Sequence, residues 1–203
     1  MCYDTSSSLT AWFLAVGISI YLYYRNKNYD RWNAAFIIAF SSMQIVEAGI
    51  WATENKNLNS LLTKLVLMIL LFQPFIQTYY GSKATKSDLL WFMSLIYLGL
   101  ILSGLHRIGT SSNEQFHTIV GQGGHLIWRD SKSSNFLGSG IVTALYLLGL
   151  FVPLLFMKQG RGILLLITGA LSALYSTTIA SKDEFGTLWC YYSVIYAIVA
   201  IFV

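Results

Sequence analysis

The chain has 203 residues, of which 55% are hydrophobic and only 11% are charged. Since a soluble domain carries about 25% charged residues, this composition excludes an ordinary water-soluble domain and indicates an exterior that faces lipid. The net charge of +4 is modest, and the basic residues form no stripe with interleaved aromatic side chains. Nucleic acid is therefore not an expected partner.

Seven apolar stretches follow one another along the chain, and each is long enough to cross a bilayer. A membrane-spanning helix needs about 20 consecutive apolar residues, with a range of about 17–25. We therefore expect an all-α fold in one domain over residues 1–203, a polytopic membrane bundle of seven transmembrane helices. Pro74 and Pro153 each lie inside a stretch, which predicts bent helices there. The expected spans are residues 8–24, 32–52, 61–80, 89–105, 140–157, 162–179 and 187–203.

The charges between the stretches predict the orientation of the chain in the bilayer. Basic residues near the ends of spans prefer the cytoplasmic side. With the N-terminus outside, the cytoplasmic loops contain seven basic residues and the short outer loops contain three. We therefore expect an outer or lumenal N-terminus and a cytoplasmic C-terminus. The two sets are Arg25, Lys27, Arg31, Lys83, Lys86, Lys158 and Arg161 inside, and Lys56, Lys64 and Lys182 outside.

Polar side chains inside the second and third stretches are the main indication of function. Gln44, Glu47 and Trp51 share one helical face through their i, i+3 and i+7 spacing. Gln73 and Gln77 share a face of the next helix through i, i+4 spacing. Because a carboxylate facing lipid costs about 2.5–3.5 kcal/mol, the face with Glu47 should point into the bundle.

The seventh stretch supplies another polar and aromatic face, formed by Trp189, Ser193 and Tyr196. Together these faces predict an outward-facing pocket inside the bundle, with Glu47 as the central ligand-binding or proton-carrying group. The glutamines would supply hydrogen bonds and the aromatic rings would form the walls. Alternatively, Glu47 is a structural carboxyl bonded to Gln73, because polar groups in spans often only hold helices together.

A long loop over residues 106–139 joins the fourth and fifth stretches on the outer side. Two apolar arms flank its glycine-rich residues 121–124, a pattern that predicts a short β-hairpin. We expect this loop, with His117, His125 and Trp128, to form a lid over the mouth of the pocket. The alternative is a short amphipathic helix that lies on the membrane.

Both cysteines, Cys2 and Cys190, map to the outer side, where an oxidising compartment would allow a disulfide between them. The alternative is two unpaired thiols, because sequence cannot show the distance between them. The histidines and cysteines lack the close spacing of zinc sites such as CxxC or HExxH. We therefore expect neither a metal nor another cofactor.

Several segments spread over the chain together resemble a known group of proteins. They are Met1-Cys2-Tyr3, residues 26–32, the stripe of Gln44, Glu47 and Trp51, the pair Gln73-Pro74, and residues 185–190. In these segments the chain is similar to an uncharacterised multipass membrane protein family of large DNA viruses of eukaryotes. The resemblance implies a host internal membrane or a virion membrane as the location, and it implies no activity, ligand or catalytic residue.

Three functions fit these observations. The first is binding or transport of a small molecule or ion at Glu47, with the lipid bilayer as the surrounding partner. The second is a structural or assembly membrane protein without a substrate, in which the polar faces fix helix packing. The third is a membrane-embedded enzyme that acts on lipid, which is disfavoured because the sequence shows no nucleophile–base or metal-ligand spacing and no catalytic residue. The sequence leaves the oligomeric state open.

Overall fold

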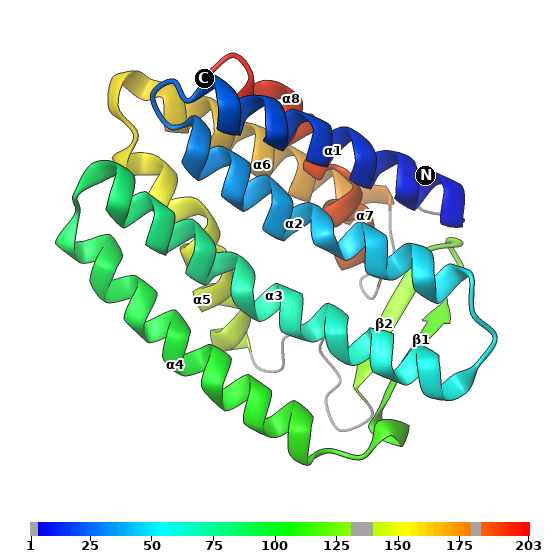
Figure 1. Ribbon diagram of the computed structural model, residues 1–203. Coiled ribbons are helices and arrows are strands. Elements are labelled where there is room, and N and C mark those ends of the chain that lie inside the picture. The colour runs from blue at the N-terminus through cyan, green and yellow to red at the C-terminus, as the bar shows by residue number, and fades with distance from the viewer. Residues whose placement is uncertain (1–3, 131–139, 180–183) are drawn as a thin grey trace.

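The computed structural model describes residues 4–130, 140–179 and 184–203, which form a helical bundle with one small β-hairpin (Figure 1). The all-α fold expected from the sequence is confirmed. The α-helices are α1 (Thr5–Arg25), α2 (Asp30–Trp51), α3 (Lys56–Thr85), α4 (Asp88–Thr110), α5 (Gly140–Phe151), α6 (Arg161–Ile179), α7 (Phe185–Tyr191) and α8 (Ser193–Ala200). The 3-10 helices are η1 (Asn113–Gln115), η2 (Val152–Phe156) and η3 (Lys158–Gly160), and the strands are β1 (Phe116–Val120) and β2 (Leu126–Asp130).

Within the described residues, five helical segments are long and apolar enough to cross a membrane: α1, α2, α3, α4 and Lys158–Ile179, which contains α6. Two of the expected spans form shorter apolar segments, Gly140–Phe156 and Phe185–Ala200. Proline explains the first break, because Pro153 has no N–H to donate and its ring clashes with the preceding turn. The α-helix therefore ends at Phe151, and η2 continues the segment as a tighter helix.

Consecutive helices from α1 to α4 pack side by side in alternating directions, which collects the connections at two ends of the bundle (Figure 1). One end holds the α1–α2 turn, the α3–α4 turn, the α5–α6 connection and the C-terminus. There Arg25 Nη1 donates to the Ile201 carbonyl at 2.5 Å, and the Lys158 N–H donates to the Tyr29 hydroxyl at 2.9 Å. We call it the basic end, and the opposite end, which carries β1 and β2, the hairpin end.

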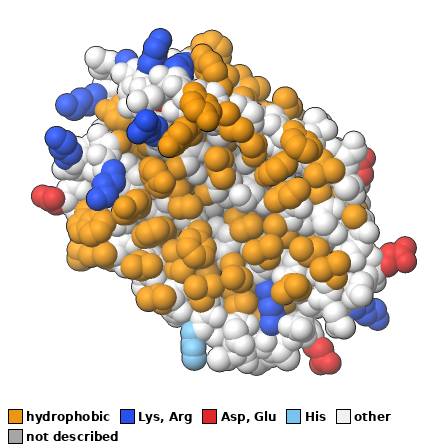
Figure 2. Space-filling view, in the orientation of Figure 1, with side chains coloured by type: hydrophobic (Ala, Val, Ile, Leu, Met, Phe, Trp, Pro, Cys, Tyr) orange, Lys and Arg blue, Asp and Glu red, His pale blue; other side chains and the backbone are white. Residues whose placement is uncertain are grey.

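Charged side chains gather at these two ends, and hydrophobic side chains cover the face between them (Figure 2). The turns of the basic end contain seven basic residues against two acidic ones, Asp30 and Asp88. Asp30 is buried and accepts two hydrogen bonds from Arg25, at 2.8 and 2.7 Å. An exposed apolar surface of this extent indicates contact with lipid or with another protein. The basic residues are Arg25, Lys27, Arg31, Lys83, Lys86, Lys158 and Arg161.

The predicted β-hairpin is confirmed, with antiparallel pairing from Phe116 opposite Asp130 to Val120 opposite Leu126. The predicted start of the loop at residue 106 is wrong, because α4 continues to Thr110. Polar residues did not end this helix, because their side chains bond within it or to the hairpin. The Thr110 hydroxyl donates to the His106 carbonyl at 2.9 Å, and Arg107 pairs with Asp130.

Gly149 sets the closest approach of α5 to its neighbours. A Cβ atom there would lie 2.5 Å from Pro74 Cβ and 2.5 Å from Tyr97 Cζ, closer than real Cβ contacts allow.

We expect Gly149→Ala to lower the unfolding temperature in mild detergent, because overpacking costs about 1–3 kcal/mol. The control is Gly99→Ala in α4, where the new Cβ would meet no described atom within 4 Å. This control should be neutral or stabilising by up to about 1 kcal/mol. Equal melting curves for the two variants would contradict this packing.

Candidate functional site

Glu47 lies inside the bundle, on α2 about one turn before its end at Trp51, with 0% of its surface exposed. Gln44 Nε2 donates to Glu47 Oε2 at 2.9 Å, while Oε1 has no hydrogen-bond partner among the described residues. In the described part of the chain, the salt bridges are Arg25–Asp30 and Arg107–Asp130, so no described basic side chain pairs with Glu47. The site therefore presents an acidic group without a compensating cation from those residues.

Four helices contribute polar groups around this carboxyl. Thr187 and Cys190, one turn apart on α7, are electrostatic neighbours of Glu47. Cys190 also neighbours Tyr146 of α5, whose hydroxyl hydrogen-bonds to Gln73 Oε1 of α3. Gln73 Nε2 has no partner among the described residues. We call this set the Glu47 cluster, composed of Gln44, Glu47, Gln73, Tyr146, Thr187 and Cys190.

Gln77 is separate from the cluster and completes a different set of bonds. Trp32 Nε1 donates to its Oε1 at 3.0 Å, and its Nε2 donates to the Leu150 carbonyl at 3.2 Å. The Leu150 carbonyl lies at the end of α5, just before the change to the 3-10 helix η2, and the carbonyls of the last helical turn need partners from outside the helix. The Gln77 side chain therefore supplies a hydrogen bond to the Leu150 carbonyl and joins α3 to α2 and α5.

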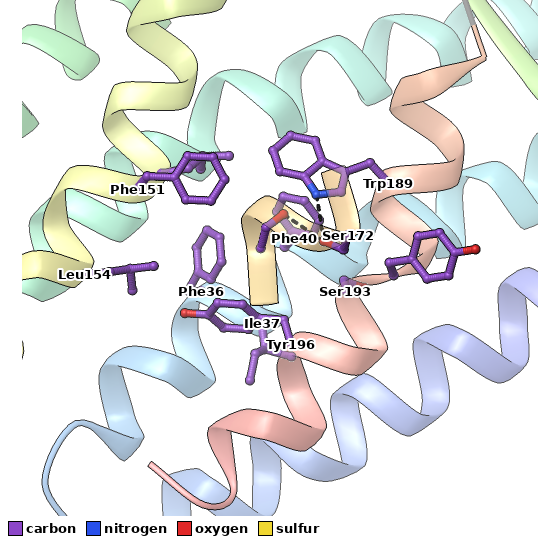
Figure 3. A pocket seen from close by; sticks show the side chains of 12 residues that line it. Phe36, Ile37, Phe40, Phe151, Leu154, Ser172, Trp189, Ser193 and Tyr196 are labelled. Carbon is purple, nitrogen blue, oxygen red and sulfur yellow. Dashed lines mark hydrogen bonds between the residues drawn. The ribbon is translucent and has the colours of Figure 1, made fainter. Parts of the chain in front are cut away.

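The predicted residues Trp189, Ser193 and Tyr196 line a small apolar cavity between α2, α5, η2, α6 and the last two helices (Figure 3). Trp189 Nε1 donates to Ser172 Oγ at 3.1 Å. The cavity measures about 30 Å³ and does not include Glu47 among its lining residues. That volume holds about one or two water molecules. Trp51, the remaining predicted residue, is half-buried near the hairpin end of α2.

The structure therefore joins Gln44 to Glu47 directly, with Gln73 in the surrounding polar set. It places Trp189, Ser193 and Tyr196 around a separate cavity, with Gln77 an interaction partner of Tyr196. No hydrogen bond joins Glu47 to Gln73 among the described residues: Glu47 bonds to Gln44, and Gln73 bonds to the Tyr146 hydroxyl. The site is closed in this structure, and its opening to the outside stays a prediction.

The hairpin packs on one end of the bundle, and its role as a lid over a pocket stays a prediction. His125 and Trp128 are buried and His117 is half-buried. Asn59 of α3 holds the edge of β1, because its side chain accepts from the Thr118 N–H at 2.8 Å and donates to the Thr118 carbonyl at 3.1 Å. This paired contact mimics a strand and fixes the hairpin on α3.

A second attachment joins the hairpin to the Glu47 cluster. The Leu126 carbonyl of β2 accepts from the Thr187 hydroxyl at 2.8 Å, and Thr187 neighbours Glu47. Trp128 packs close to Gly186, where a Cβ would lie 2.9 Å from the indole ring. Movement of the hairpin would therefore change the surroundings of Glu47.

Glu184, just before α7, is a second carboxyl with 0% of its surface exposed, and it was not among the predicted site residues. Glu184 Oε1 accepts from the Gly123 N–H at 2.9 Å, in the turn of the hairpin. A Cβ at Gly121 or Gly123 would overlap this carboxyl group, so the turn must lack side chains there. The available signal was the glycine-rich turn itself, because closely spaced backbone N–H groups form concave sites for anions.

No protein-family model, curated protein or solved structure matches this chain. The resemblance to the viral multipass family therefore stays a prediction from the residues quoted above. The Cys190 thiol is buried and free, and Cys2 lies outside the described residues, so their pairing also stays a prediction. Among the described residues, no group of three or more His, Cys, Asp or Glu side chains could hold a metal ion.

Burial lowers the pKa of His125 below its ordinary value of 6.5, and nearby Glu184 partly opposes this shift. A lowered folded-state pKa means that docking favours the neutral imidazole, so this contribution to stability is present above about pH 6.5 and is lost as pH falls. We expect the protection factors of the β1 and β2 amides, which compare the exchange rate with the intrinsic rate at the same pH, to fall between pH 7.5 and 5. His125→Gln should flatten this dependence.

His106→Gln is the matched control for that measurement, because His106 is exposed on α4. It should keep the wild-type pH dependence of hairpin exchange. An identical profile for His125→Gln and wild type would show that another group controls docking of the hairpin.

Proposed function

We propose that this chain is a multipass membrane protein that crosses the bilayer seven times. Five segments have the required length and composition. The segment of α5 and η2 adds 12 residues of α-helix to 5 of 3-10 helix. At about 1.5 and 2.0 Å per residue it spans about 28 Å, close to the roughly 30 Å of a hydrocarbon core. The 16 residues of Phe185–Ala200 span less, and the bilayer adapts to a short segment by thinning.

The proposed orientation places the basic end in the cytoplasm and the hairpin end outside or in a lumen. The seven basic residues at one end support it, because such residues are retained on the cytoplasmic side. The membrane itself is a host internal membrane or a virion membrane, which rests on the resemblance alone.

Within this bundle, we propose that the Glu47 cluster binds a proton or a small cation and carries it during transport. The observation that supports this most strongly is the buried carboxyl of Glu47, with one oxygen unpartnered among the described residues. A buried charge without a counter-ion is strongly unfavourable, so the group must hold a proton or pair with a cation. Ionisable groups at membrane depth commonly mark ion and proton pathways.

We propose that the hairpin of β1 and β2 acts as the gate of this site. The hydrogen bond between Leu126 and Thr187 closes the outer side, and Glu184 holds the turn in place. Release of these two contacts would expose the cluster to the outer solution. In this proposal, the structure described above, with both contacts formed, is the closed state, and release of the contacts gives the open state.

A structural role is the second candidate, and one observation favours it. Gln77 bonds on both sides of its amide to Trp32 and Leu150 and so serves the packing of the bundle. If Glu47 has the same purpose, Gln44 is its permanent partner and no ion crosses. An enzyme gains less support, because His125 is an electrostatic neighbour of Glu184 rather than of Glu47 or Cys190.

Flux measurements separate these candidates. In liposomes that contain a pH-sensitive dye, we expect wild-type protein to dissipate an imposed proton gradient faster than empty liposomes. Glu47→Gln should slow this flux by about 10²-fold, the lower part of the range for loss of a proton-transfer group. Parallel sodium and potassium gradients test whether a cation replaces the proton.

Glu54→Gln is the matched control, because Glu54 undergoes the same chemical change at an exposed position after α2. It should transport like the wild type. Folded wild-type protein that dissipates none of the three gradients, together with a lower unfolding temperature for Glu47→Gln, would favour the structural role. Equal flux in Glu47→Gln and wild type would remove Glu47 from the pathway.

A further inference from the structure

A larger cavity lies apart from the Glu47 carboxyl, between α3, α4 and α5 at the hairpin end. It measures about 210 Å³. A dry apolar cavity of roughly 150 Å³ is sufficient to bind benzene. This cavity can therefore hold an apolar group larger than one aromatic ring, without movement of the helices.

The cavity is long and apolar on its sides. Its lining follows α4 from Tyr97 to Arg107, a distance of about 15 Å at the α-helical rise. Aliphatic side chains such as Leu67, Leu71, Leu100 and Val142 form much of the walls, and Ser103 adds one hydroxyl group. This shape fits a single extended hydrocarbon chain better than a compact ligand.

The deep end offers the occupant no unpaired hydroxyl group. The Tyr97 hydroxyl donates to the Leu145 carbonyl at 2.7 Å, and the Tyr146 hydroxyl bonds to Gln73. Gly149 packs against Pro74 and Tyr97 beside them, which closes the space between α3, α4 and α5. The deep end is therefore suited to the methyl end of a chain.

The hairpin end of the cavity carries charge. Arg107 Nη2 pairs with Asp130, whose side chain is only 8% exposed, whereas the Arg107 side chain is 55% exposed. A guanidinium group has five N–H donors in a planar fork that matches a carboxylate. One of its nitrogens serves Asp130, and its exposed donors can bind a second anion at the mouth.

We propose that this cavity binds a long-chain fatty acid, with the hydrocarbon chain between α3, α4 and α5 and the carboxylate on Arg107. The long apolar cavity favours a ligand with a single hydrocarbon chain, and the Arg107 guanidinium group favours a ligand with an anionic head group. The binding site is distinct from the carboxyl of Glu47, so it does not depend on ion transport. The two sites touch at Tyr146, which lines the cavity and bonds to Gln73.

The test is a fluorescence titration of the wild-type protein in phosphatidylcholine nanodiscs. The probe is parinaric acid, a fluorescent fatty acid that accepts energy from tryptophan, and palmitate is the competitor. We expect saturable binding that palmitate displaces. Hexadecanol, with the same chain and no charge, should compete about tenfold less strongly, as expected for loss of one hydrogen bond to a charged group.

Two matched pairs of variants locate the site. Leu100→Trp fills the channel and should weaken palmitate binding by about tenfold or more, whereas Leu102→Trp, on an exposed part of α4, should not. Arg107→Gln combined with Asp130→Asn removes the head-group cation without leaving a buried unpaired carboxylate. It should weaken palmitate but not hexadecanol, and Arg129→Gln, an exposed arginine on β2, should weaken neither.

Each possible result decides the proposal. Equal competition by palmitate and hexadecanol on the wild type overturns recognition of the carboxylate, whatever the variants do. Unchanged binding in a folded Leu100→Trp variant, or an equal loss in Leu102→Trp, overturns the location. Displacement of the probe by two-chain phosphatidic acid as effectively as by palmitate overturns selection of a single chain. Because the readout is binding, loss of ion flux in Glu47→Gln neither supports nor contradicts it.

Discussion

An apolar exterior is the constraint on which the rest of this structure depends. Large hydrophobic side chains are exposed on α1 to α6 and on α8, and they cover the face seen in Figure 2. Polar groups inside the helical segments must therefore find partners in the interior. Gln77 meets this requirement by bonding to Trp32 and to the Leu150 carbonyl at the end of α5. Glu47 meets it only in part, because one of its oxygens has no partner among the described residues. This difference in hydrogen bonding is the reason for proposing a packing role for Gln77 and a chemical role for Glu47.

The hairpin extends this constraint to the end of the bundle. Its backbone is bonded to α3 through Asn59 and to α7 through Thr187, so it forms part of the packing rather than an independent loop. Glu184 fills the turn from below, where glycine allows a carboxyl group to approach the backbone. The hairpin therefore contacts Glu184 directly, and it contacts Thr187, which is a neighbour of Glu47.

The sequence predicts the helical segments well, because apolar length is a local property of the chain. It underestimates α3 and α4, whose ends depend on the Asn55 cap and on the pairing of Arg107 with a distant strand. It places Gln44 and Glu47 on one face correctly, because helical spacing fixes neighbours on the same helix. It cannot place Tyr146 and Cys190 near Glu47, because contacts between helices depend on how the helices pack and not on the sequence of any one segment.

The bond between Arg25 and the Ile201 carbonyl has a consequence for biogenesis. Its two ends are 176 residues apart, and α1 also packs against α8. During synthesis the first helix therefore waits for nearly all of the chain before its final partner exists. Until then the surface of α1 that later contacts α8 has no partner within the chain. Closure of the bundle is consequently a late event, and truncation after α6 would leave α1 packed against α2 but without α8.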